Sequence, residues 1–122
     1  MITRDQNLSL MRVVTIKEVE EVVKGLKKNK AAGPDGFVME FYQAAWKFIA
    51  SDIIEVVEES RRNQKVCPGL NATLLSLIPK TSKWDDLQRF RPITLCNVIY
   101  KTISTLIVKI LKPILPSVIS LE

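Results

Sequence analysis

Two short apolar runs, separated by a polar loop, constrain the fold of this chain more than any other feature. The first run spans 72–78 and ends at Pro79, and the second spans 92–95 and begins with Pro92. Helix and strand both remain open for runs this short, but the flanking breakers and the short length favour strands. Proline is tolerated at strand ends and edges. The sequence therefore predicts one short antiparallel β pair joined by the loop 81–90.

A cation stands at the loop end of each predicted strand, Lys80 on the first and Arg91 on the second. If the strands pair antiparallel, both cations lie near the same end of the hairpin. Arginine presents a planar fork that matches phosphate oxygens, and lysine supplies a flexible point charge. One interpretation is a site that grips a triphosphate. The other is a pair of solvated charges at two strand ends.

Helical periodicity on both sides of the β pair predicts an α+β fold that is mostly α-helical, with about four helices. Thr15 and Glu18 have the spacing of a capping box, and Asn97 is a favoured N-cap residue before the last apolar stripe. Ser51 and Asp52 favour a cap that starts a separate helix. Residues 1–14 are expected to be a weakly ordered lead-in. The expected helices run over about 15–27, 38–50, 51–62 and 97–111.

A turn is predicted between the first two helices, at Gly33-Pro34-Asp35-Gly36, because Gly-Pro and Asp-Gly are strong turn signals. It follows a stretch that contains Lys28 and Lys30. Glycine lets a backbone approach a nucleic-acid chain closely. The alternatives are an ordinary turn and a helix end whose lysines complement the helix dipole.

The charge distribution favours a polyanionic partner. The chain carries 18 basic and 13 acidic residues, a formal net charge of +5, and within 87–122 the only acidic residue is Glu122. Nucleic acid is the simplest such partner, and a basic domain without one is the alternative. The chain has no histidine, which excludes Ser-His-Asp and Cys-His catalysis as well as histidine-ligated metal sites within it.

Other patterns point to an intracellular protein, with nucleus and cytoplasm both open. The N-terminus lacks the apolar core of a signal peptide, and no apolar run is long enough for a membrane span. Cys67 and Cys96 are too few for a cysteine-only zinc site and are expected to be reduced thiols. Asp85 and Asp86 are adjacent in a predicted loop, so no complete set of metal-binding acids is expected.

Three stretches taken together resemble the N-terminal part of a reverse transcriptase: KKNKAAGPDGFVMEFY, NATLLSLIPK and FRPITLCNVIYKTISTLIVKILKPILPSVIS. Their order and spacing are similar to those of non-LTR (LINE-type) retrotransposon enzymes, in particular the form abundant in plant genomes. The resemblance covers 15–120. It implies that 15–122 form the fingers and the start of the palm of a right-hand polymerase.

The resemblance also implies roles for particular residues. The residues matching Lys80 and Arg91 hold the triphosphate of the incoming nucleotide in that family. The stretch matching 28–37 lies near the template strand. The template-contact residues implied in this chain are Lys28, Lys30, Gly33, Pro34, Asp35 and Gly36.

The metal-binding aspartates of the family have no counterpart here. Asp85-Asp86 does not match the family's paired aspartates, because Lys-Trp precedes it rather than a small residue. We therefore expect no catalytic residue, no bound metal and no polymerase activity from these residues alone, with Mg²⁺ needed only in a full-length enzyme. The expected partners are an RNA or DNA template and a deoxynucleoside triphosphate, without a membrane. The alternatives are a non-catalytic basic nucleic-acid-binding module and a retrotransposon remnant without function. The stripe from Ile99 to Ile114 is expected to leave an exposed apolar patch that favours self-association.

Overall fold

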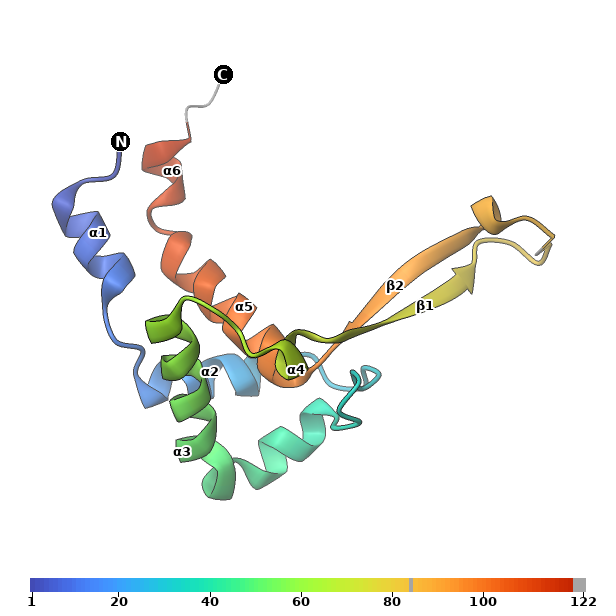
Figure 1. Cartoon of the computed structure of the whole chain (residues 1–122), viewed down its shortest axis with the longest axis horizontal. Coiled ribbons are helices and arrows are strands. Elements are labelled where there is room, and N and C mark those ends of the chain that lie inside the picture. Colours follow the sequence, from blue (N-terminus) through green and yellow to red (C-terminus); the bar gives the residue numbers. More distant parts are fainter. Residues whose placement is uncertain (84, 120–122) are drawn as a thin grey trace.

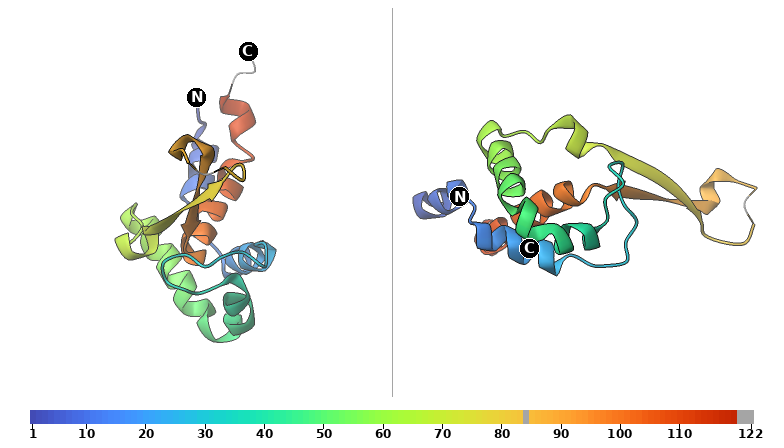
Figure 2. Two further views of the ribbon diagram at one scale, coloured as in Figure 1. Left: turned by 90° about the vertical axis from the view of Figure 1, so that its right-hand side faces the viewer. Right: turned by 90° about the horizontal axis from the view of Figure 1, so that it is seen from below.

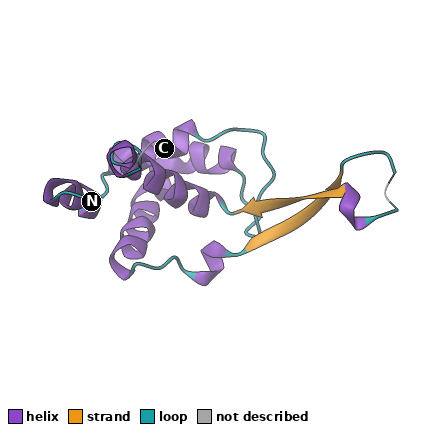
Figure 3. Cartoon of the chain, turned by 90° about the horizontal axis from the view of Figure 1, so that it is seen from above, coloured by secondary structure: helices purple, strands orange, loops and turns teal. Residues whose placement is uncertain are grey.

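The computed structural model describes residues 1–83 and 85–119, and it combines a helical body with one projecting β-hairpin (Figure 1). Figure 3 shows the α-helices gathered at one end of the molecule and both strands extending from the other. The predicted α+β, mostly helical class is confirmed. The elements are α1 (Arg4–Met11), α2 (Ile16–Gly25), α3 (Met39–Asn63), α4 (Pro68–Asn71), β1 (Thr73–Pro79), the 3-10 helix η1 (Leu87–Arg89), β2 (Phe90–Cys96), α5 (Val98–Leu111) and α6 (Leu115–Val118).

The hairpin is the antiparallel pair that the sequence predicts. Its register places Thr73 opposite Cys96 at the base and Pro79 opposite Phe90 near the tip. Pro92 lies inside β2 rather than at its first residue, which a two-stranded sheet tolerates because each strand keeps an open edge. All seven residues of β1 are exposed. The hairpin therefore stands away from the core with both faces uncovered.

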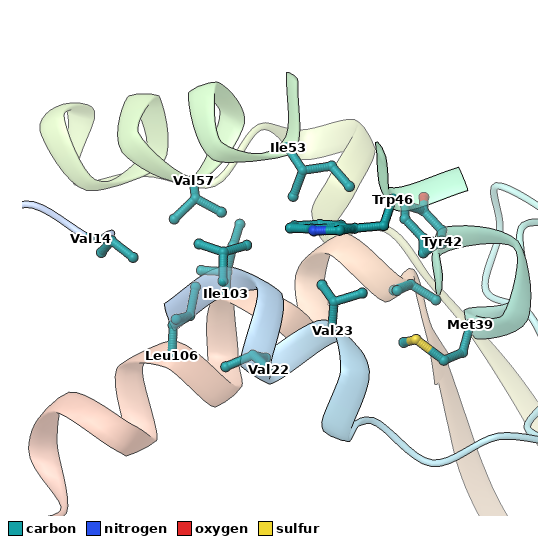
Figure 4. Packing of buried hydrophobic residues seen from close by; sticks show 12 residues of the cluster. Val14, Val22, Val23, Met39, Tyr42, Trp46, Ile53, Val57, Ile103 and Leu106 are labelled. Carbon is teal, nitrogen blue, oxygen red and sulfur yellow. The ribbon is translucent and has the colours of Figure 1, made fainter. Parts of the chain in front are cut away.

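The core lies where α2, α3 and α5 meet. In α2, Val19, Val22 and Val23 are buried at spacings of three and four, which place them on one side of the helix. Figure 4 shows side chains from the three helices pointing toward one another. The buried cluster comprises Val14, Val19, Val22, Val23, Met39, Tyr42, Trp46, Ile53, Val57, Val98, Ile103 and Leu106.

The predicted capping box at Thr15 is confirmed. The Thr15 hydroxyl accepts a hydrogen bond from Glu18 N, and a Glu18 carboxylate oxygen accepts one from Thr15 N at 2.9 Å. The two bonds satisfy amide groups that a helix N-terminus otherwise leaves unpaired. Helix α2 consequently begins at Ile16, and it ends at Gly25, two residues before the predicted end.

The expectation of a break at Ser51-Asp52 is wrong, because one helix, α3, continues through it. The buried residues Met39, Tyr42, Trp46, Ile53 and Val57 keep helical spacing across this point. A continuous apolar face stabilises an uninterrupted helix more than a capping residue favours a new start. Figure 1 shows α3 changing direction between its teal and green parts.

The first 14 residues contain an element that the sequence analysis missed. Helix α1 begins after Thr3, whose side chain forms a capping box with Gln6. No residue of α1 is buried, so apolar periodicity gave no signal for it. The Gln6 amide also donates to the Ser117 hydroxyl at 2.9 Å, which brings α1 beside α6, as Figure 1 shows.

Part of the predicted apolar stripe from Ile99 to Ile114 is exposed. Ile103, Leu106 and Ile114 are buried, whereas Ile107 and Leu111 remain exposed. Self-association through such surface stays a prediction, as does the assignment of 15–122 to a polymerase domain. Within the described residues, no helix combines the length and apolar character that crossing a lipid bilayer requires.

Candidate nucleic-acid and triphosphate sites

Lys80 and Arg91 lie at the same end of the hairpin. Arg91 pairs with Ile78, and Lys80 stands two residues beyond Ile78, with its backbone N–H still bonded to Arg89 O at 2.7 Å. Because alternate residues of a strand share a face, this register favours Lys80 and Arg91 on one side of the hairpin. Both side chains are exposed, and neither takes part in an ion pair within the described part of the chain.

The hairpin tip also contains cations that the sequence analysis did not select. A shallow cavity of about 400 Å³ is lined by Lys80, Lys83 and Arg89 together with Gln88, whereas Arg91 is not part of its lining. The Lys80 ammonium donates to Gln88 O at 3.2 Å. The tip therefore offers several donors for an anion, and the cavity lies on the loop side of Arg91.

Asp85 and Asp86 stabilise the tip loop. An Asp86 carboxylate oxygen accepts a hydrogen bond from Gln88 N at 3.1 Å and caps η1, and Asp85 pairs with Arg89 at 3.2 Å. Within 1–83 and 85–119, no three or more histidine, cysteine or acidic residues gather closely enough to hold a metal ion. Trp84, which stands beside these aspartates in the predicted loop, lies outside the described residues.

The turn predicted at Gly33–Gly36 is confirmed. Gly36 N donates to Gly33 O at 3.0 Å, and Gly36 has a φ of 76°, a conformation that glycine adopts without strain. The Asp35 carboxylate accepts a hydrogen bond from Phe37 N at 2.9 Å, which fixes the exit of the turn. The Tyr42 hydroxyl donates to the other Asp35 oxygen at 3.5 Å. Burial, with a smaller contribution from the Asp35 charge, raises the pKa of Tyr42 to about 12.

Asn97 fastens this turn to the base of the hairpin, a role that differs from the predicted one. It occupies the N-cap position of α5, but its side chain makes no capping hydrogen bond. Its side-chain oxygen instead accepts a hydrogen bond from Asp35 N at 3.0 Å, and its amide nitrogen donates to Gly69 O and Leu70 O at 3.3 and 3.4 Å. The residue is only 1% exposed. The predicted N-cap position is confirmed, but the side chain joins three segments that are distant in sequence instead of bonding to the first turn of α5.

Gly33 permits the close packing at this junction. A Cβ on Gly33 would lie 2.5 Å from both Asn97 N and the Cys96 carbonyl carbon. Both are backbone atoms, so they cannot move aside by a side-chain rotation. Figure 2 (right) shows the loop before α3 passing beside the base of the hairpin. Glycine is therefore needed at position 33 so that the turn can pack against the backbone of Cys96 and Asn97 inside the protein.

The lysines before the turn are solvent-accessible. Lys28 and Lys30 are exposed, and the intervening Asn29 has a φ of 57°, in the left-handed region. A Glu40 carboxylate oxygen accepts a hydrogen bond from Asn29 N at 2.6 Å, which lowers the pKa of Glu40, with a smaller contribution from Lys28. This bond holds the lysine-bearing segment against the start of α3.

The structure does not bring the two sets of predicted residues together. The turn packs against Cys96 and Asn97 at the hairpin base, whereas Lys80 and Arg91 lie near the tip. Five residue steps separate Arg91 from Cys96, which is about 17 Å at the rise of an extended strand. Any ligand that touches both sets must therefore be extended.

A comparison with known proteins gives a match. The chain is 28% identical over 106 residues to the protein named "Transposon TX1 uncharacterized 149 kDa protein" from Xenopus laevis. The matched region covers 87% of this chain but 8% of that protein. No protein-family profile matches the chain. The similarity supports a transposon-derived chain.

Proposed function

We propose that this chain is part of the RNA-directed DNA polymerase of a non-LTR retrotransposon and that it contacts the template and the triphosphate of the incoming nucleotide. The observation that carries the proposal is the register that brings Lys80 and Arg91 to one end of a projecting hairpin. The similarity to a transposon protein agrees with it. A fingers position and a plant-like origin belong to the same proposal.

The chemistry of the tip suits a triphosphate. Arg91 can form two parallel hydrogen bonds to phosphate oxygens, and Lys80 adds a second cation on the side that the register favours. Neither charge is neutralised by an ion pair among the described residues. A charge-assisted hydrogen bond contributes about 1.5–3 kcal/mol. Two such contacts, partly screened by water, suffice for weak, measurable binding.

The proposed template contacts lie at the other end of the hairpin. Lys28 and Lys30 are exposed, and the turn Gly33–Gly36 is held rigidly by Asn97. A rigid turn loses little conformational freedom when a ligand binds to it. The residues Pro34, Asp35 and Gly36 are exposed on its outer side.

Phosphoryl transfer in such an enzyme requires magnesium, and the residues described here do not fit a magnesium site. Asp85 and Asp86 are engaged in an ion pair and a helix cap, and no cluster of metal-binding groups is found among 1–83 and 85–119. The proposed contribution of this chain is therefore binding and orientation, with no chemical step assigned to it.

Binding of a fluorescent deoxynucleoside triphosphate to the full 122-residue chain tests the proposal. We expect Lys80→Ala and Arg91→Ala each to weaken binding about tenfold, because each removes one charge-assisted contact. Lys109→Ala is the matched control, since it removes an exposed lysine on α5 far from the tip in sequence. Equal affinity of all three variants and the unchanged chain would refute the triphosphate site.

The same variants separate a polymerase part from a general nucleic-acid-binding module. Binding that depends only on phosphate contacts weakens steeply with salt. A module without a nucleotide site would bind single strands with such a salt dependence and would bind a triphosphate no better than inorganic phosphate. A polymerase part would prefer the triphosphate, and the preference would disappear with Lys80 and Arg91.

A further inference from the structure

A second cationic depression lies on the helical body, away from the hairpin tip. It is a cavity of about 370 Å³ where the end of α2, the segment after it and the first turns of α5 meet. Lys27, Lys30 and Lys101 contribute to its lining. Two of these lysines lie before the Gly33–Gly36 turn, and the third comes from α5, about 70 residues further along the chain.

The apolar part of the same cavity comes from three different elements. Leu26 follows α2, Met39 begins α3 and Val98 begins α5. Met39 and Val98 belong to the buried core, so this part of the lining is fixed by packing rather than by mobile surface chains. The cavity therefore combines a rigid apolar lining with three lysines.

The three lysines lack partners within the described part of the chain. The ion pairs there join Arg12 to Glu18, Lys24 to Glu20, Arg61 to Glu58 and Arg89 to Asp85, and none involves a residue of this cavity. Cations of like charge around one depression repel one another, and an anion bound between them removes that cost. The arrangement thus favours an anionic ligand with an apolar part.

We propose that this cavity binds one nucleotide unit of a single-stranded nucleic acid, with the phosphate among the lysines and the sugar or base against Leu26, Met39 and Val98. Its volume lies in the range of about 300–1,000 Å³ that is usual for small-molecule sites. The proposal rests on the proposed template contact, because Lys30 and the Gly33–Gly36 turn belong to one continuous segment. The proposal adds Lys27 and Lys101 to the residues that contact the single-stranded nucleic acid.

Titration of the full chain with a 12-nucleotide single-stranded RNA, followed by NMR of the backbone amides, tests this site. We expect the largest shifts at the amides of Ala31, Val98 and Lys101. Lys27→Gln and Lys101→Gln should each weaken binding several-fold and reduce the slope of log affinity against log salt by about 0.7, the value for one lost phosphate contact on a single strand. Lys109→Gln, on the same helix, is the matched control.

The outcomes separate this inference from the triphosphate site. Lys27→Gln and Lys101→Gln should leave triphosphate affinity unchanged, whereas Lys80→Ala and Arg91→Ala should leave the shifts at Val98 intact. Equal effects of Lys101→Gln and Lys109→Gln, with native spectra for both, would overturn the cavity site alone. Equal shifts at the same amides with inorganic phosphate or a glutamate-rich peptide, at matched ionic strength, would also overturn it. If the chain binds no triphosphate but the RNA still shifts the amides of Ala31, Val98 and Lys101, only the assignment of a triphosphate site to the hairpin tip is overturned.

Discussion

Replacing Asn97 by alanine tests whether this residue holds the Gly33–Gly36 turn against the hairpin base. The change removes the acceptor for Asp35 N, at 3.0 Å, and the donor to Gly69 O and Leu70 O, at 3.3 and 3.4 Å. We count the two longer bonds, from the Asn97 amide nitrogen to Gly69 O and Leu70 O, as one weak hydrogen bond shared between two acceptors. Leaving a buried polar group without a partner costs about 1–3 kcal/mol, and groups that water can reach cost less. We expect Asn97→Ala to lower the free energy of unfolding by about 2–3 kcal/mol.

Gly33→Ala disturbs the same junction from the other side. The new Cβ would meet Asn97 N and the Cys96 carbonyl carbon at 2.5 Å and the Asn97 side-chain oxygen at 2.7 Å. Overpacking of this kind costs about 1–3 kcal/mol. Removing the Asn97 side chain relieves only the contact with its oxygen, because the backbone atoms remain. The double variant should therefore be less destabilised than the sum of the two single variants.

Urea unfolding followed by circular dichroism measures these changes, and amide hydrogen exchange locates them. Asn63→Ala is the matched control, because Asn63 is exposed at the end of α3. In Asn97→Ala, the Asp35 amide should lose protection. If Asn97 acted as an ordinary N-cap, the amides of Ile99 and Tyr100 would lose protection instead. That pattern, or a stability equal to that of Asn63→Ala, would refute the junction.

Further predictions concern pH and association. The folded-state pKa of Tyr42 is raised to about 12 from 10.0, so the stability that the protonated Tyr42 hydroxyl contributes is complete below pH 10 and is lost as the pH rises through 12. Tyr42→Phe should remove this pH dependence from unfolding curves measured at alkaline pH. The hydrogen bond from Arg12 lowers the pKa of Glu18 to about 2 from 4.5, so its contribution is present above pH 4.5 and is lost as the pH falls through 2. That contribution should be only about 1 kcal/mol or less, because water reaches both side chains and screens the ion pair. Acid titration of Glu18→Gln measures it. The uncovered hairpin should cause concentration-dependent association in sedimentation velocity, which Leu75→Ser, at a side chain 68% exposed, should reduce; a monomer at every concentration would contradict this.

Local signals in the sequence predicted the elements that local interactions stabilise. The capping box at Thr15 set the start of α2, and the prolines and polar residues around the two apolar runs predicted the hairpin. Helix α1 carried a similar signal at Thr3 and Gln6, but without a buried side it offered no apolar pattern. The continuity of α3 depended on packing against α2 and α5, which Ser51 and Asp52 could not reveal.

The candidate sites were predictable to different degrees for the same reason. The placement of Lys80 and Arg91 follows from the antiparallel pairing of two apolar runs that are close in sequence. The role of Asn97 depends on a contact with Asp35, 62 residues away, and the lysine cavity depends on Lys101 meeting Lys27 and Lys30. Neither contact has a local signature, because its partners become neighbours only after the helices pack.

The junction at Asn97 determines how the two proposed sites are related. The turn and the hairpin base are joined by a side-chain hydrogen bond and by close backbone packing at Gly33. Beyond that base the hairpin has no covered face, and only the pairing of β1 with β2 positions Lys80 and Arg91. The proposed template contacts are therefore attached to the helical core, whereas the proposed triphosphate contacts lie on an arm that only strand pairing holds. We expect a ligand that contacts both the tip and the body to couple the occupancy of the two proposed sites through the hairpin.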